Sequence, residues 1–123
     1  MRMWAVPPII LCRQHLLGAH NETHMFAGTI IKKKALDGYI KSNALEISSL
    51  IEYHETLAVE MARRKYNHNK PLPEFDVKYL PAYVIDFKID KRTSLWELVT
   101  RCKICYVRYQ MYMHEDPDLY IIK

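Results

Sequence analysis

The chain has 123 residues, a formal net charge of +4 and a pI near 8.9, and half of its residues are hydrophobic. This length fits one domain with a single core, and the composition excludes an intrinsically disordered chain. No apolar run reaches the roughly 18 residues of a membrane span, and residues 1–5 lack the layout of a secretory signal. Three cysteines, an odd number, fit a reducing compartment better than a disulfide framework. We therefore expect a soluble cytoplasmic protein.

The first predicted helix begins at Pro7 and Pro8, because proline suits the first helical turn. Apolar residues then recur at mostly helical spacing as far as the lysines 32–34, whose charges complement the negative end of the helix dipole. Gly18 and Gly28 lie inside this stretch, where each costs roughly 1 kcal/mol relative to alanine. A bend, or a close approach by another backbone, would explain either glycine.

The second predicted helix has the clearest apolar stripe: Ile47, Leu50, Ile51, His54, Leu57, Ala58 and Met61. It ends near Tyr66. Prolines between residues 70 and 90 predict an extended surface connection. Residues 84–89 alternate as a strand would, but no partner strand is evident, so extended coil packed on helices is expected.

The third predicted helix opens at residues 94–97, which have the spacing of a capping box. Its apolar stripe includes Cys102, Cys105, Tyr106 and Tyr109, and the helix ends before Pro117. Three main helices with long connections predict an all-α fold, forming a single compact domain over residues 1–123.

One set of residues in the first half of the chain resembles a known family. The set is Met1-Arg2, Arg13-Gln14-His15-Leu16-Leu17, Glu22 and Phe26-Ala27-Gly28, with a weaker continuation at residues 61–67. It is similar to the phage-type pyrimidine-dimer DNA glycosylases with AP lyase activity, also called the endonuclease V repair family. The spacing of seven residues from His15 to Glu22 holds without gaps from the N-terminus.

The resemblance implies that an N-terminal amine is the nucleophile, and it places Met1 at that position. An α-amine, with a pKa of about 7.7–8.0, is partly neutral at pH 7, whereas a lysine amine at about 10.4 is not. Methionine is normally removed only before small residues, so we expect Met1 to stay before Arg2. Without the resemblance, Met1 would be taken for an ordinary chain start.

By the same resemblance Glu22 is the catalytic glutamate, which would hold the amine and the abasic sugar, stabilise positive charge and shuttle protons. Otherwise it is a solvated helix side chain. In a functional role, His15 would orient the amine or contact phosphate. In a structural role, it would be an interior histidine with satisfied hydrogen bonds. Arg2 would contact phosphate; otherwise it is a surface arginine.

The family carries arginines around the glutamate, where this chain has Asn21 and Met25. The loss of these arginines lowers the expected affinity for DNA. The mild positive charge permits phosphate binding. The expected DNA-binding residues are Arg2, Arg13, His20, Asn21, His24, Lys32, Lys33, Arg63 and Arg64, with Lys34, Lys65, Arg101 and Arg108 as further candidates. For any single one of these, a solvated surface role is the commoner one. Counterparts of the family's C-terminal aromatic segment would be Tyr106, Tyr109, Tyr112 and Tyr120.

Two spacings in the sequence are typical of metal sites. His20 and His24 lie one helical turn apart, but no third ligand is evident in the sequence. Cys102 and Cys105 fall on an apolar stripe, and no second cysteine pair completes a zinc site, which favours packing roles. No metal and no other cofactor is therefore expected.

The leading hypothesis is a DNA glycosylase with AP lyase activity, a DNA-repair enzyme that excises pyrimidine dimers or related base damage. It would act on double-stranded damaged DNA as a monomer, without a membrane, in the cytoplasm of the host cell if the source is viral. One alternative is a catalytically inactive DNA-binding or protein-interaction module on the same scaffold. Another is a nuclease that uses a metal bound by His20 and His24.

Overall fold

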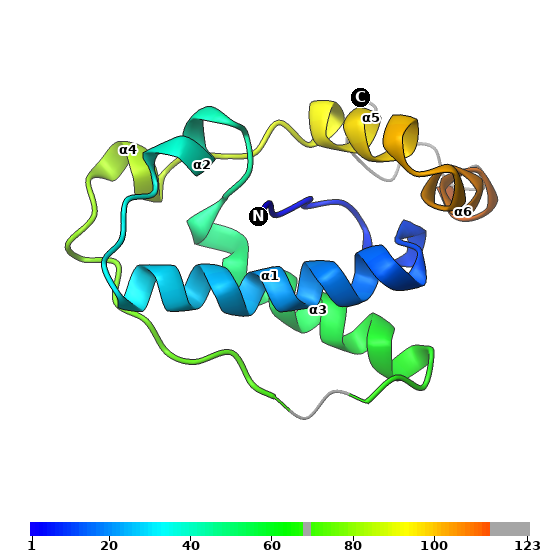
Figure 1. The fold of residues 1–123 in the computed structure, drawn as a ribbon, viewed down its shortest axis with the longest axis horizontal. Helices are drawn as coiled ribbons and strands as arrows, with labels where there is room; N and C mark the ends of the chain where they lie inside the picture. Colours follow the sequence, from blue (N-terminus) through cyan, green and yellow to red (C-terminus); the bar gives the residue numbers. More distant parts are fainter. Residues whose placement is uncertain (68–69, 114–123) are drawn as a thin grey trace.

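The computed structural model describes residues 1–67 and 70–113, and within them it is all-α, as the sequence predicts. Its α-helices are α1 (Arg13–Ile31), α2 (Asp37–Lys41), α3 (Leu50–Arg63), α4 (Ala82–Ile85), α5 (Lys91–Arg101) and α6 (Lys103–Met113) (Figure 1). Two short 3-10 helices, η1 (Pro8–Ile10) and η2 (Ile47–Ser49), precede α1 and α3. No strand occurs among the described residues; the alternating segment 84–89 instead begins inside α4.

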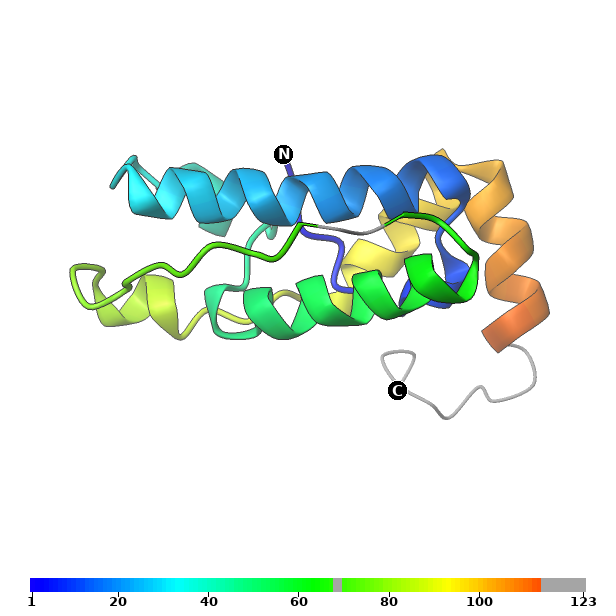
Figure 2. The same cartoon turned by 90° about the horizontal axis from the view of Figure 1, so that it is seen from below.

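The long helices α1 and α3 lie side by side and run in opposite directions (Figures 1 and 2). Helices α5 and α6 cover one end of this pair, and the short helices α2 and α4 lie near the other end. The N-terminal segment passes between the α1–α3 pair and α5. Of the helices described, none is long and apolar enough to cross a membrane.

The core forms where the apolar faces of these helices meet. Its completely buried side chains include Leu16, Phe26 and Ile30 of α1, Leu50 and Leu57 of α3, and Leu98 of α5. Each such side chain contributes roughly 1.5–3 kcal/mol by leaving water. Most of the predicted stripe of the second helix is confirmed, but the assignment of Ile51 to it was wrong, because that side chain is 57% exposed.

Two predicted helix starts differ from the structure. Helix α1 begins at Arg13 and not at Pro7, because the prolines start η1 and Cys12 caps α1, its Sγ accepting the His15 N–H at 3.4 Å. Helix α5 begins at Lys91 and is capped by Asp90, whose Oδ1 accepts the Thr93 N–H at 3.1 Å. The Ser94 hydroxyl is not a cap; it donates to the carbonyl of Trp4.

The third predicted helix is two helices in the structure. At Cys102 the backbone turns to extended angles, φ −125° and ψ 108°, and α6 then leaves in a new direction (Figure 2). No proline or glycine lies near this position, so local sequence gives no signal for the break.

Three helices end in the same left-handed turn without glycine. The residue after the C-cap has a positive φ at Lys33 (55°), Asn43 (57°) and Lys65 (65°). In each turn the amide of the following residue donates to the carbonyl five residues before it, as in a Schellman motif: Lys34 to Thr29, Ala44 to Tyr39 and Tyr66 to Met61.

The two glycines inside α1 lie in open surroundings. At Gly18 and Gly28 an added Cβ would meet no atom within 4 Å, so no close backbone approach explains either glycine.

Candidate functional site

The N-terminal segment is fixed inside the protein by three hydrogen bonds. The Met3 amide donates to the Ala44 carbonyl at 2.7 Å, and the Ser94 hydroxyl donates to the Trp4 carbonyl at 2.5 Å. The Tyr53 hydroxyl donates to the carbonyl of Val6 at 3.1 Å. Because Met3, Trp4 and Val6 are buried, the chain leaves the core at one defined place, where Met1 is 39% exposed.

Glu22, on α1, faces this exit. Its Oε2 accepts the backbone N–H of Arg2 at 2.5 Å. The Met1 amine is separated from that nitrogen by only three covalent bonds of about 1.3–1.5 Å each. Among residues 1–67 and 70–113, the ion pairs include none between this amine and Glu22, so the carboxylate is held beside the amine through the Arg2 amide.

The side chain of Arg2 is directed to α5. Its Nη1 lies 2.6 Å from Glu97 Oε2, and its guanidinium carbon lies 4.5 Å from the centroid of the Trp4 ring. Glu97 also accepts Arg101 Nη2 at 3.5 Å. Sequence reasoning predicted a phosphate contact for Arg2 and gave no signal for Glu97, because no local spacing links positions 2 and 97.

His15 belongs to a different neighbourhood from Glu22. Its Nδ1 lies 3.2 Å from Cys12 Sγ and 3.6 Å from Cys105 Sγ, and its ring meets the Trp4 ring edge-on at 5.9 Å. Burial raises the pKa of the Cys105 thiol. Burial also acts to raise the pKa of Cys102, but hydrogen bonds, chiefly from the Cys105 amide, bring it below its usual value. In the structure Trp4 stands between His15 and Arg2.

His20 and His24 face α3 and meet a third imidazole there. Their ring centroids lie 4.8 Å apart, and each lies within about 5 Å of the ring of His54, at 5.1 and 5.0 Å. His54 Nδ1 is 2.9 Å from the Glu55 carboxylate. Sequence reasoning found no third ligand for the pair because His54 comes from another helix. Asn21 and Met25 are exposed on α1.

Some predicted DNA-binding arginines are held by the protein itself. Arg63 and Arg64 both bind Glu60, at 2.5 and 2.7 Å, and Arg64, only 11% exposed, also donates to the carbonyls of Pro8 and Ile9. Burial acts to raise the pKa of Glu60, but the hydrogen bonds and charges of the two arginines outweigh it and lower the pKa below its usual value.

The remaining predicted contacts are exposed basic side chains on several elements. Arg13 lies over the Tyr66 ring at 5.4 Å, and Lys33 lies over the Tyr79 ring at 5.3 Å. Lys32 is exposed at the end of α1. Arg108, a further candidate, donates twice to the Ile9 carbonyl, at 3.0 and 2.7 Å, and so has a structural role.

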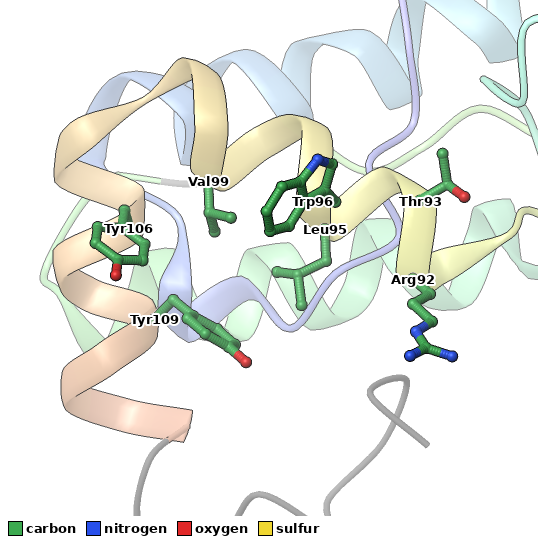
Figure 3. Close-up of a pocket in the computed structure, with 7 residues that line it drawn as sticks. All are labelled: Arg92, Thr93, Leu95, Trp96, Val99, Tyr106 and Tyr109. Carbon is green, nitrogen blue, oxygen red and sulfur yellow. The ribbon is translucent and has the colours of Figure 1, made fainter.

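An aromatic pocket of about 510 Å³ lies between α5 and α6 (Figure 3). It is lined by Arg92, Thr93, Leu95, Trp96, Val99, Tyr106 and Tyr109. Tyr106 and Tyr109 were candidates for the family's aromatic segment, and Trp96, 69% exposed, is an addition that sequence reasoning missed. Tyr112 is exposed under the guanidinium of Arg108, and Tyr120 lies outside the described residues.

Comparison with known proteins gives a family for the N-terminal part of this site. The family described as pyrimidine dimer DNA glycosylase matches residues 1–74. The matched range includes Met1, Arg2, His15 and Glu22, and it ends before α5 and α6. No curated protein and no solved structure matches the chain.

Proposed function

The chain belongs to the pyrimidine dimer DNA glycosylase family, and from this premise we propose that it is an active glycosylase with AP lyase activity. Its substrate would be double-stranded DNA with pyrimidine dimers or related base damage. The observation that carries the proposal is the Glu22 carboxylate on the Arg2 amide, beside the Met1 amine. The buried segment 3–6 supports it, because a nucleophile must be held in one place.

In the glycosylase step, the neutral Met1 amine attacks C1′ of a nucleotide turned out of the duplex. The N–C1′ bond forms as the glycosidic bond breaks, and the base leaves with that electron pair. Opening of the sugar ring then gives a protonated imine, with a proton delivered to O4′. In this proposal Glu22 accepts the proton that the amine loses and returns it to the sugar oxygen, and its contact with the Arg2 amide supports that role.

In the lyase step, the Glu22 carboxylate, which has returned its first proton to O4′, takes a proton from C2′, and the C3′–O bond then breaks. The 3′ phosphate leaves with the electron pair, and water hydrolyses the imine to free the amine. On an abasic site the same imine forms when the amine adds to the C1′ aldehyde and water is lost. A fixed carboxylate stabilises the positive charge of the protonated imine, and fixed basic side chains stabilise the negative charge that develops on the phosphate.

A second candidate, an inactive DNA-binding protein, is favoured by one observation. Asn21 and Met25 stand where the family has arginines, and the guanidinium groups of Arg2 and Arg64 are bound to glutamates of this chain. Such a protein would keep affinity for the phosphate backbone without forming an imine.

Borohydride trapping on a duplex with one abasic site tests the proposal, because borohydride reduces the imine to a stable adduct. We expect the wild type to form the adduct, N-terminal acetylation to abolish it, and Glu22→Gln to slow it by roughly 100-fold or more. Glu52→Gln, an exposed glutamate on α3, is the matched control and should react as the wild type does. Absence of an adduct with DNA binding retained would establish the second candidate instead.

A further inference from the structure

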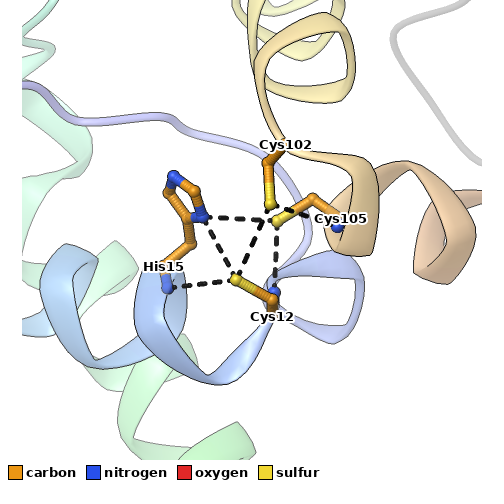
Figure 4. A group of neighbouring side chains, drawn as sticks. All are labelled: Cys12, His15, Cys102 and Cys105. Carbon is orange, nitrogen blue, oxygen red and sulfur yellow. Dashed lines mark hydrogen bonds between the residues drawn. The ribbon is translucent and has the colours of Figure 1, made fainter.

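Four side chains that could bind one metal ion meet at one end of the protein. They are Cys12 and His15 at the start of α1, and Cys102 and Cys105 at the junction of α5 and α6 (Figure 4). Their ligand atoms all lie within 4.8 Å of one another. The two pairs are 90 residues apart in the chain, and each pair has the two-residue spacing typical of zinc ligands.

The distances between these atoms match a tetrahedral zinc site. With Zn–S bonds of about 2.3 Å and Zn–N bonds of about 2.0–2.1 Å, tetrahedral angles place two sulfurs about 3.8 Å apart and a sulfur and a nitrogen about 3.6 Å apart. Cys12 Sγ and Cys102 Sγ are 3.9 Å apart, and Cys105 Sγ lies 3.6 Å from His15 Nδ1. The contact between Cys12 Sγ and His15 Nδ1, at 3.2 Å, is shorter than that geometry, and the ligand atoms of all four residues lie within 4.8 Å of one another.

Backbone amides surround the sulfurs as they would surround thiolates. In each pair the amide of the second residue donates to the first sulfur, His15 to Cys12 and Cys105 to Cys102, both at 3.4 Å. The Cys12 amide donates to Cys105 Sγ at 3.2 Å. Such hydrogen bonds disperse the negative charge of metal-bound sulfur and fix its orientation.

The helix break at Cys102 helps to bring the four side chains together. A continuous helix through residues 91–113 would keep Cys102 on a helical backbone, and the extended angles at that residue instead let both sulfurs reach the start of α1. Since no glycine or proline causes the break, a tertiary interaction has to stabilise it. A metal ion bound to both segments would do so.

We propose that Cys12, His15, Cys102 and Cys105 form a closed, structural zinc site. Three sulfurs and one imidazole favour Zn²⁺ over hard cations such as Mg²⁺, and four protein ligands leave no position for a reacting water. Binding displaces one proton from each of the three thiols, so the occupied site carries one net negative charge. His15 binds through Nδ1 as a neutral imidazole whose proton is on Nε2.

This assignment departs from the expectation that the protein binds no metal, and it gives His15 a structural role. Sequence reasoning looked for a second cysteine pair, whereas the second pair is Cys12-x-x-His15. The site would join the α5–α6 junction to the start of α1. It does not depend on the proposed catalysis, because Glu22 contacts none of the four side chains within the described hydrogen bonds.

Metal content of the purified full-length chain, expressed with zinc and measured by mass spectrometry, is the first test. We expect one zinc per wild-type chain, at least a five-fold loss in Cys102→Ser/Cys105→Ser, and no loss in His24→Gln. The last variant is the control for the nearby cluster of His20, His24 and His54, which also has ligand atoms within 4.8 Å of one another. Zinc lost from His24→Gln but kept in the cysteine variant would overturn the proposal.

Cobalt substitution of the wild type keeps the test decisive if the cysteine variant fails to fold. Co²⁺ added to chelator-treated protein should give the intense visible bands of a tetrahedral site together with thiolate-to-cobalt charge transfer. Chelation should lower Tm by roughly 5–15 °C, and zinc should restore it. A metal-free wild type with three titratable thiols, or one with a Cys12–Cys102 disulfide, would refute the site.

Discussion

Arg2 is bound at two points by glutamates from two helices. Glu22 of α1 accepts its backbone N–H, and Glu97 of α5 accepts its guanidinium. The peptide that follows Met1 is therefore fixed at both its main chain and its side chain. The Met1 amine, which we propose as the nucleophile, would need this restraint, because the terminal residue of a chain otherwise stays mobile until substrate binds.

Glu60 has the clearest pH-dependent role among the described residues. It is buried, and Arg63 and Arg64 hold its pKa below the usual 4.5. We expect Glu60→Gln to lower the free energy of unfolding by about 1.5–3 kcal/mol at pH 7, because charge-assisted hydrogen bonds are lost.

The sign of the pH effect follows from the lowered pKa. Stability that comes from the ionised Glu60 is complete above the unfolded-state pKa near 4.5 and is lost as pH falls through the folded-state value. Urea denaturation of both proteins from pH 3 to 7 measures this. The difference between them should be constant above about pH 5.5 and shrink below 4.5; a difference independent of pH would exclude the ionised form as its cause.

At the scale of single residues, the sequence predicted only those site residues whose spacing matches the family. The gapless match predicts a site formed by Met1 and Glu22, and in the structure Glu22 contacts the amide of Arg2, the residue after Met1. The catalytic roles of Met1 and Glu22 stay predictions. Glu97, His54 and Cys12 were missed as partners, since each comes from an element distant in sequence and no periodicity joins the elements.

The turns that end α1 and α3 have a left-handed backbone conformation at residues other than glycine. Lys33 and Lys65 adopt positive φ although a Cβ makes that region costly, by roughly 1–2 kcal/mol for an L-residue. The bonds from Lys34 to Thr29 and from Tyr66 to Met61 satisfy helix carbonyls in return. Each such end is therefore a place where stability can be gained.

Lys65→Gly tests this directly. We expect the free energy of unfolding to rise by about 0.5–1 kcal/mol, because glycine removes the Cβ strain and part of that gain is lost to the freer unfolded chain. Lys65→Ala is the matched control: it removes the same exposed side chain but keeps the Cβ, and should bring no gain. Equal effects of the two substitutions, in thermal or urea unfolding, would mean that φ strain is not the cause.

At the scale of elements, periodicity predicted that helices exist but placed their ends less well. The stripes of α1 and α3 were found because buried residues recur every three to four positions. The start of α5 was misplaced because Ser94 has capping-box spacing, while Asp90 makes the cap and Ser94 bonds Trp4. The break at Cys102 has no local signal at all.

At the scale of the whole molecule, side chains from the part outside the family match hold the part that matches it. Residues 1–74 match the family, yet Trp4 is held by Ser94, Arg2 by Glu97 and Ile9 by Arg108. We expect a fragment of residues 1–74 to lack a cooperative thermal transition and to form no borohydride adduct, although it contains both Met1 and Glu22. Circular dichroism melts and trapping of fragment and full chain would measure this, and an active fragment would contradict it.

The all-α class and single core followed from composition and stripes, but the path of the N-terminal segment did not. Residues 3–6 lack helical spacing and are too few to show a period, so only tertiary packing reveals that they lie in the core. The same limit applies to the connections between helices, which carry no periodic pattern.

The burial of residues 3–6 also orders events during synthesis. Arg2 and Trp4 leave the ribosome long before Ser94 and Glu97, the groups that fix them. Until the later residues emerge, the contacts of Trp4 with Ser94 and of Arg2 with Glu97 cannot form. The N-terminal segment thus acquires its fixed position only after most of the chain has been translated, and only then is the amine that we propose as the nucleophile held beside Glu22.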